Sequence, residues 1–220
     1  MATSALIGGQ WGDEGKGKVA DILAGKMDWV VRFQGGANAG HSLEIDGQAL
    51  KLHLLPSGLH RVSCKLGLGT GMVIDPFALY DEIQMWYETS GEELAPERLH
   101  IDGRAHLVLP RHLVEDDGGG RIDTTRRGIG PAYSEKAKRT NLRMIDLVDN
   151  PEKVLAALTH EGGDSNRGKQ CIKRLSPHVT DLSHELRMSQ AKGREILLEG
   201  AQGALLDIDH GSYPYVTSSS

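Results

Sequence analysis

The sequence has few cysteines, few aromatic residues and no long hydrophobic run, and each of these features excludes a class of protein. Only Cys64 and Cys171 occur among the 220 residues, without metal-ligand spacing, so we expect two reduced thiols. No segment approaches the ~20 apolar residues of a membrane-spanning helix. The first residues also lack the basic and apolar regions of a signal peptide. These absences predict a cytoplasmic protein.

The sequence also lacks an excess of positive charge. Its 25 Lys and Arg residues face 30 Asp and Glu residues, and the formal net charge is -5. This balance argues against nucleic acid as the main partner. It leaves room for a small phosphorylated ligand, because a local cluster of cations and backbone N–H groups can bind phosphate within an acidic protein.

Glycine is abundant, with 28 residues, and glycines follow several short apolar segments. Residues 5–7 predict a buried strand, residues 16–24 a helix and residues 29–33 a second strand, an order typical of a mostly parallel α/β sheet with flanking helices. Further predicted elements are a hairpin of 43–45 with 49–55, strands at 72–74 and 196–198, helices at 76–88, 151–159 and 179–188, and a flexible loop at 116–121. We expect residues 1–220 to form a single nucleotide-binding domain, incomplete at its carboxyl-terminal end.

A glycine-rich loop joins the first predicted strand to the first predicted helix. Gly12, Gly17 and Lys18 match the phosphate-binding pattern G-x-x-x-x-G-K, and Lys16 adds a second cation. Val19 stands where Ser or Thr would bind Mg²⁺, which weakens the alternative of a general P-loop NTPase switch. Asp13 offers a hard oxygen ligand in its place. A purely structural glycine-rich turn is the less favoured alternative.

The loop after the second predicted strand contains Asn38, Ala39, Gly40 and His41. Loops at the carboxyl ends of parallel strands converge on one crevice. We therefore expect Asp13 and His41 to face the same ligand, one as a base and the other as an acid.

Two later segments carry further polar groups. Thr125 lies in a run of hydroxyls and arginines that suits a second phosphate, whereas Lys136 and Lys138 are expected to form a solvated basic face. Gln202 follows the strand at 196–198. Asp207, Asp209 and His210 suit either a metal cluster or a structural loop network.

Five sequence motifs together resemble the adenylosuccinate synthetase family. They are G-G-Q-W-G-D-E-G-K-G-K, N-A-G-H, L-H-L-L-P-S-G, R-G-I-G-P-A-Y and the segment from Glu199 to Ser219. The resemblance implies that GTP phosphorylates the 6-oxygen of IMP and that L-aspartate then displaces the phosphate. It also implies a magnesium ion and a homodimer.

The resemblance assigns roles by motif. Asp13 and His41 match the catalytic base and acid, and Lys16 and Gln202 are also placed in the catalytic group. Asp13 and the carbonyl of Gly40 match the Mg²⁺ ligands. The predicted GTP-phosphate contacts are Gly12, Asp13, Glu14, Gly15, Lys16, Gly17, Lys18, Gly40, His41 and Ser42. The predicted IMP contacts are Asn38, Ala39, Thr125, Gln202, Thr217 and Arg139, the last from the neighbouring subunit.

The sequence departs from the family pattern at several positions. Ala37 replaces a residue that is often polar, and Arg126 replaces the usual glycine of T-T-G-R-G. The compact region between Arg143 and Ile196 is similar to short phage enzymes that act on dGMP, although Asp13 favours IMP. The family's aspartate-receiving and guanine-reading segments are not among these residues. A non-catalytic nucleotide-binding module is therefore the alternative from another class.

Overall fold

A parallel β-sheet forms the centre of the molecule. The computed structural model describes residues 3–45, 48–118, 124–160 and 163–220. Within these residues the sheet contains β1 (Thr3–Gly8), β2 (Trp29–Gly35), β5 (Lys65–Ile74), β6 (Leu99–Asp102), β7 (His106–Leu107), β8 (Val179–Thr180) and β9 (Ile196–Gly203). The strand order is β1-β9-β2-β5-β6-β8, and β7 pairs with the end of β5. All these pairings are parallel, which confirms the predicted fold class.

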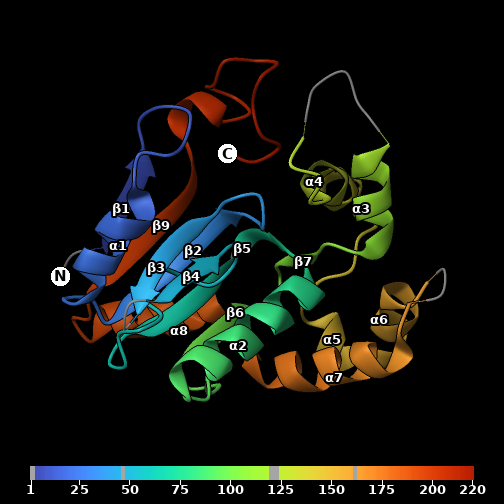
Figure 1. The fold of residues 1–220 in the computed structure, drawn as a ribbon, viewed down its shortest axis with the longest axis horizontal. Coiled ribbons are helices and arrows are strands. Elements are labelled where there is room, and N and C mark those ends of the chain that lie inside the picture. Colours follow the sequence, from blue (N-terminus) through green and yellow to red (C-terminus); the bar gives the residue numbers. More distant parts are fainter. Residues whose placement is uncertain (1–2, 46–47, 119–123, 161–162) are drawn as a thin grey trace.

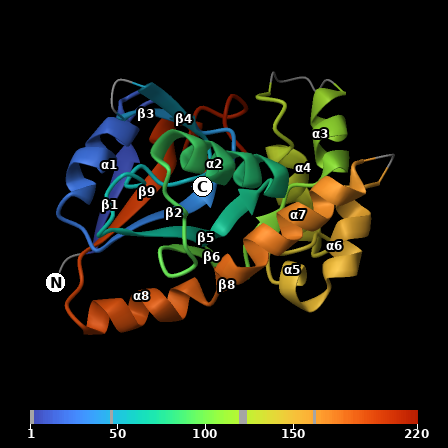
Figure 2. The ribbon, with the colours of Figure 1, turned by 60° about the horizontal axis from the view of Figure 1, so that its bottom comes forward.

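Helices lie on both faces of the sheet and beyond one of its ends (Figure 1 and Figure 2). They are α1 (Lys16–Ala24), α2 (Pro76–Ser90), α3 (Pro110–Asp117), α4 (Ile129–Lys138), α5 (Asp146–Asp149), α6 (Pro151–Leu158), α7 (Ser165–Leu175) and α8 (Leu182–Ala191). The hairpin of β3 (His41–Ile45) and β4 (Gln48–Leu52) is a separate antiparallel sheet. In Figure 2, α1 and α2 lie on one side of the sheet and α8 on the other. Figure 1 shows that α3 to α7 gather beyond the β7 end of β5.

The alternation of side chains along β2 explains why both faces are covered. Val30 packs with Ala20 and Ala24 of α1, whereas its neighbours Trp29 and Val31 pack with Leu182 of α8. Successive strand residues point to opposite faces, so an apolar β2 needs a helix on each side. The largest buried cluster lies between β5 and α2 and includes a run of leucines from Leu50 to Leu59.

Local sequence signals set the ends of α2. The Asp75 carboxylate accepts hydrogen bonds from the backbone nitrogens of Phe77 (2.9 Å) and Ala78 (3.2 Å), and Pro76 occupies the first helical turn. Gly91 ends the helix in the left-handed conformation, at φ 72°. These are the residue types that favour the start and the end of a helix.

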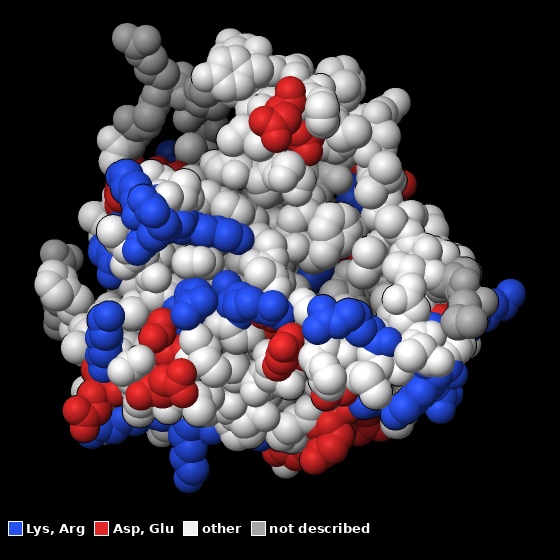
Figure 3. Space-filling model, turned by 180° about the vertical axis from the view of Figure 1, so that it is seen from behind, with Lys and Arg blue, Asp and Glu red and all other residues white. Residues whose placement is uncertain are grey.

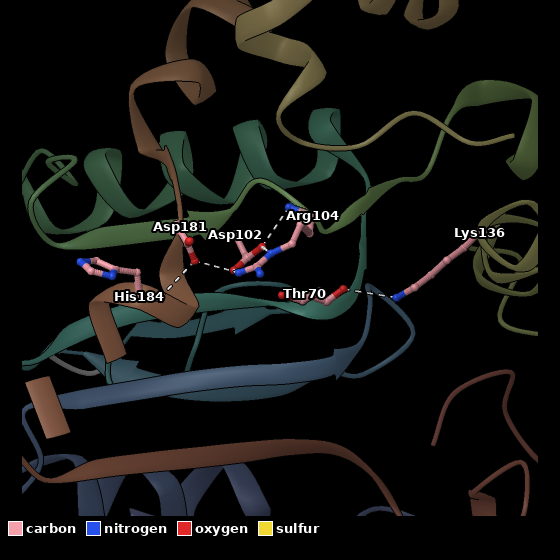
Figure 4. A network of polar contacts seen from close by, with 6 residues as sticks. All are labelled: Thr70, Asp102, Arg104, Lys136, Asp181 and His184. Carbon is pink, nitrogen blue, oxygen red and sulfur yellow. Dashed lines mark hydrogen bonds and ion pairs between the residues drawn. The ribbon is translucent and has the colours of Figure 1, made fainter. Parts of the chain in front are cut away.

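A polar network joins β6 to the start of α8 (Figure 4). Asp102, at the end of β6, accepts hydrogen bonds from Arg104 Nε (2.9 Å) and Nη2 (2.8 Å). The same Arg104 nitrogen lies 2.8 Å from Asp181, which caps α8 by accepting from the backbone nitrogen of His184. Burial raises the pKa of the Asp102 carboxyl, but the hydrogen bonds from Arg104 outweigh it, so this pKa lies below its usual value.

Several sequence predictions need correction. The strand at 5–7 is not buried, because β1 is an edge strand and Ile7 is 67% exposed. Asp116 and Asp117 belong to α3 rather than to a flexible loop. The region 179–188 is not one helix, since it begins with β8, and an additional helix, α7, lies between the helices predicted at 151–159 and 179–188.

Other sequence features have a direct structural counterpart. Cys64 and Cys171 are buried and free, as expected. No helix among the described residues is long and apolar enough to cross a membrane. The net negative charge is unevenly distributed, since Lys and Arg side chains form a band across the face seen from behind (Figure 3).

Candidate nucleotide site

The glycine-rich loop between β1 and α1 turns through three residues in the left-handed conformation. Gly12 has φ 102°, Asp13 φ 57° and Gly15 φ 80°, and Gly15 directly precedes α1. Glycine adopts this region freely, and aspartate tolerates it better than most residues. The loop therefore ends with the N-terminus of α1 facing the crevice, where backbone N–H groups favour an anion.

Glu14 folds back into its own loop. Its Oε1 accepts from the backbone nitrogens of Gln10 (2.9 Å) and Gly12 (3.2 Å), and its Oε2 lies 2.7 Å from Lys16 Nζ. The hydrogen bond from Lys16, helped by the two backbone N–H groups, lowers the pKa of Glu14 to about 2. Glu14 is thus ionised and holds both the loop and its lysine.

The second loop follows β2. Gly36 N donates to Asn38 Oδ1 (3.1 Å), and Asn38 Nδ2 donates to Thr217 Oγ1 (3.2 Å). The structure thus brings together two predicted IMP contacts that are far apart in the sequence. His41 begins β3, but its side chain lies outside the described part of the chain, so its predicted pairing with Asp13 stays a prediction.

His53 packs against the loop that follows β2. Its Nδ1 lies 2.9 Å from the carbonyl oxygen of Ala39. A Cβ atom at Gly40 would lie 3.2 Å from the same nitrogen, so the imidazole packs closely against this glycine. The contact fixes the backbone of Ala39 and Gly40, two predicted binding residues.

Buried charges hold the segment that carries His53. The Glu82 carboxylate of α2 accepts from the backbone nitrogens of residues 53–55 at 2.8–3.1 Å. Arg32, 1% exposed, donates to the carbonyl oxygens of His53, Leu54 and Gly36. Burial lowers the pKa of the Arg32 guanidinium, and the charges of Glu199 and Glu82 oppose that effect. The opposite charges of these buried groups offset one another, and backbone groups supply their hydrogen bonds, as burial requires.

Two polar side chains of β9, Glu199 and Gln202, belong to the site. Glu199, 3% exposed, accepts from Ser57 N (2.9 Å) and Ser57 Oγ (2.5 Å), which ties β9 to the 53–57 segment. Burial raises the pKa of Glu199, and the charge of Arg32 opposes this shift. Gln202 Oε1 accepts from Ser219 Oγ (3.1 Å), whereas Gln202 Nε2 is buried and has no hydrogen-bond partner among the residues that the structure describes. An unpaired buried donor is costly.

The loops enclose one cavity of about 590 Å³. It is lined by Trp11, Gly12, Asp13, Glu14, Gly15, Lys16, Gly17, Lys18, Arg32, Asn38, Ala39, Gly40, Ser42, Glu199, Gly200, Ala201, Gln202 and Leu206. Its lining includes every predicted GTP-phosphate contact except His41. Of the predicted IMP contacts it includes Asn38, Ala39 and Gln202, and Thr217 is bonded to Asn38.

The segment from Thr125 to Arg139 does not line this cavity. Thr125 is exposed, and Arg139 is an exposed residue at the end of α4. Lys138 is exposed, as expected, but Lys136 is half-buried and donates to the carbonyl oxygen of Thr70 at 3.2 Å (Figure 4). The prediction of a fully solvated lysine was therefore wrong for Lys136.

Tyr133 links α4 to β2 and β5, a role that sequence reasoning missed. Its hydroxyl donates to the carbonyl oxygen of Gly71 (2.7 Å) and accepts from Gly35 N (3.0 Å). Burial raises the pKa of Tyr133 to about 12, so the phenol keeps its proton. Its place in the R-G-I-G-P-A-Y motif was the available signal, as L-H-L-L-P-S-G was for His53.

The segment after Gln202 forms a structural loop. Asp207 Oδ1 accepts from the backbone nitrogens of Asp209 (2.8 Å) and His210 (2.9 Å). Among the described residues no group of three His, Cys, Asp or Glu side chains is placed to hold a metal ion. Of the two alternatives for this segment, the contacts favour the loop network.

The strand order, the glycine-rich loop after β1 and the loop after β2 together define an α/β protein of the phosphate-loop class. The family model described as adenylosuccinate synthetase matches residues 5–220. The chain belongs to the adenylosuccinate synthetase family.

Relatives and solved structures give the same family. The chain is 43% identical to the adenylosuccinate synthetase of a Synechococcus species, covering 100% of this chain and 55% of that protein. It is 44% identical to the adenylosuccinate synthetase of Thermus thermophilus, covering 100% and 56%. The chain therefore spans about half the length of the curated relatives that it matches.

Two solved structures resemble the fold. The fully ligated adenylosuccinate synthetase of Plasmodium falciparum has a TM-score of 0.85 and 35% identity, over 99% of this chain and 55% of that one. The succinoaminodeoxyadenylate synthetase of cyanophage S-2L, bound to dGMP and to dATP as an energy donor, has a TM-score of 0.74 and 29% identity, over 100% and 57%. This chain is thus more similar to the Plasmodium enzyme than to the phage enzyme.

Proposed function

We propose that this chain carries the phosphate-binding part of an adenylosuccinate synthetase, which uses GTP to join L-aspartate to IMP. The observation that supports the proposal is the single cavity in which the loops after β1, β2 and β9 meet. A phosphate loop and an exposed carboxylate face the same space there, and Gln202 lines it from β9. This combination suits two nucleotides better than a single phosphate.

The proposed chemistry has two steps. Asp13 takes the N1 proton of IMP, which makes the 6-oxygen nucleophilic toward the γ-phosphate of GTP. His41 assists at the 6-oxygen as an acid. The amine of aspartate then attacks C6 and phosphate leaves, because a phosphorylated oxygen is a far better leaving group than the original one.

Mg²⁺ fits the donors on the cavity wall. The Asp13 carboxylate and the backbone carbonyl of Gly40 belong to residues that line the cavity, and both groups are hard oxygen donors. Mg²⁺ sites in nucleotide enzymes commonly use one or two carboxylates and complete the shell with phosphates and water. When bound, the ion would neutralise charge on the phosphates.

The remaining proposed contacts surround the base and the IMP phosphate. Asn38 and Thr217 hold each other, and Gln202 lines the cavity from β9. Ala39 lines the same wall, while Thr125 and Arg139 lie on the separate α3–α4 part of the chain. Arg139 is proposed to act on the site of a neighbouring subunit in a homodimer.

The decisive experiment is an assay with IMP, GTP, L-aspartate and Mg²⁺. It is run on this chain and on the same chain continued with the carboxyl-terminal part of the Thermus thermophilus relative, and calorimetry measures IMP binding to both. We expect both to bind IMP and the continued chain to turn over. A preference for dGMP over IMP would identify dGMP as the substrate. Absence of both binding and turnover would overturn the proposal.

Asp13→Asn tests the base. Asparagine also tolerates the left-handed conformation of Asp13, so the loop should keep its shape. We expect a fall of about 10²–10⁴-fold in turnover by the continued chain, the usual contribution of a general base, with IMP affinity within a few-fold. Asp21→Asn on α1 is the matched control. Turnover by Asp13→Asn at the rate of the unchanged chain would remove Asp13 from this role.

A further inference from the structure

The phosphate loop already contains an anion, the carboxylate of Glu14. One of its oxygens accepts from the backbone nitrogens of Gln10 and Gly12, and the other lies 2.7 Å from Lys16 Nζ. The side chains of Lys16 and Glu14 are only 11% and 18% exposed. The cation expected to attract a nucleotide phosphate is therefore neutralised by the loop itself.

Two glycines from different strands make room for this carboxylate. A Cβ atom at Gly8, the last residue of β1, would lie 2.5 Å from Glu14 Oε1, and one at Gly203, the last residue of β9, would lie 2.6 Å from it. Both distances are too short for any side chain. The sheet thus provides a fitted position for Glu14, which distinguishes it from a surface carboxylate that happens to meet a lysine.

A phosphate and a carboxylate compete for one ammonium group at such a site. Lys18, the other lysine of the glycine-rich motif, is exposed, so Lys16 is the more shielded of the two lysines that line the cavity. Two anions at one half-buried ammonium repel each other more strongly than they would in water. An incoming phosphate must therefore take the place of Glu14 Oε2, while Oε1 can keep its bonds to the Gln10 and Gly12 backbone.

We infer that Glu14 is an internal competitor for the nucleotide phosphate and is exchanged for it on Lys16 during binding. The inference rests on the proposed function, since it takes the loop to be a phosphate site. A competitor of this kind lowers the affinity of every anion that must displace it, so that only a highly charged di- or triphosphate keeps useful affinity. Glu14 would thus set an affinity threshold that single phosphate or carboxylate ions do not reach.

A double-mutant cycle tests the exchange with inorganic triphosphate as the probe. Calorimetry measures its affinity for the unchanged chain, Glu14→Gln, Lys16→Met and the double variant, and thermal unfolding checks that each is folded. We expect Glu14→Gln to raise the affinity for triphosphate about tenfold in the chain that keeps Lys16. In the Lys16→Met background the same change should raise it less than about twofold. Glu152→Gln, at an exposed position on α6, should leave the affinity unchanged.

The outcomes separate exchange from simple charge removal. An equal gain in both backgrounds means a general electrostatic effect and overturns the inference, as does weaker or absent binding in Glu14→Gln. The carboxyl carbon resonance of Glu14 gives a direct second measurement, because it should shift when triphosphate is added and a fixed resonance contradicts exchange. Triphosphate contains no purine, so the exchange can be tested separately from IMP binding. If the cycle shows that Glu14 and Lys16 are coupled but the chain does not bind IMP, only the proposed function is refuted.

Discussion

Three residues other than glycine have positive φ angles among those described, and each lies in or beside a predicted binding segment. Asp13 has φ 57°, Arg126 φ 55° and Arg139 φ 64°. Arg139 ends α4, where a left-handed residue is common. Asp13 is one of the types that tolerate this conformation, but arginine at 126 has no such advantage. The departure of Arg126 from the family's usual glycine thus coincides with backbone strain.

Arg126→Gly should stabilise the protein. Glycine adopts φ 55° without strain, and the ion pair of Arg126 with Asp117 is exposed on both sides and contributes little. We expect a gain of about 0.5–1 kcal/mol and a rise in Tm of about 1–4 °C. The neighbouring Arg127→Gly, where φ is not positive, should destabilise instead. Equal effects of the two changes in a thermal unfolding experiment would contradict the explanation.

Residue types in the first loop could be predicted because their chemistry is local. Asp13 lies between β1 and α1, Lys16 and Lys18 lie in the first turn of α1, and all three line the cavity. His53 and Tyr133 could not be assigned in this way. Their partners, Ala39 and Gly71, are set by tertiary packing, which no local spacing reveals.

At the scale of elements, helices with clear end signals were predicted best. The helix at 16–24 is α1 with the same bounds, and the helix at 76–88 ends two residues later, at Ser90, before Gly91. The first half of β5 was missed because Gly67, Gly69 and Gly71 interrupt its apolar pattern. A Cβ atom at Gly71 would lie 2.2 Å from the carbonyl oxygen of Phe33, so close strand packing requires this glycine.

Glu82→Ala tests the buried polar link between α2 and the 53–55 segment. The change leaves three backbone N–H groups without their acceptor and removes a negative charge close to Arg32. We expect a loss of about 3–5 kcal/mol in the free energy of unfolding in urea. Gln84→Ala, an exposed change on the same helix, should cost less than about 0.5 kcal/mol.

The milder Glu82→Gln keeps one acceptor oxygen but places an amide against N–H donors. We expect it to cost about 2 kcal/mol, between the two other variants. This variant keeps the test informative if the alanine variant fails to fold. Unfolding free energies of Glu82→Gln and Gln84→Ala that agree within error would show that the buried carboxylate contributes nothing.

At the scale of the whole molecule, the order of the strands explains why the site forms. β9 lies between β1 and β2 although it comes last in the sequence, and this brings Gln202 beside the first two loops. The alternating pattern of strands and helices predicted a parallel sheet, but not this order. Strand order depends on which strands pair in three dimensions, and the apolar patterns of β1, β2 and β9 are too similar to specify it.

Acid stability of the whole fold should depend in part on Glu135, which joins α4 to α3. Its carboxylate lies 2.6 Å from Arg111 Nη2 and 2.9 Å from His112 Nε2. The hydrogen bond from Arg111 has the largest effect on the pKa of Glu135, and the contact with His112 adds to it. Together they lower this pKa to about 2. A carboxyl whose pKa is lower in the folded state stabilises the fold above its unfolded pKa of 4.5 and loses this contribution as the pH falls toward 2.

Glu135→Gln should therefore cost stability at neutral pH but not in acid. Because Arg111 is about half exposed, solvent screens the pair, and we expect a loss of only about 1 kcal/mol at pH 7. Urea unfolding from about pH 7 to pH 3 should show the difference from the unchanged chain constant above about pH 5 and shrinking below it. Glu115→Gln, exposed on α3, should follow the unchanged chain throughout. A difference that grows toward low pH would mean that Glu135 binds its proton more readily in the folded state, which the guanidinium of Arg111 opposes.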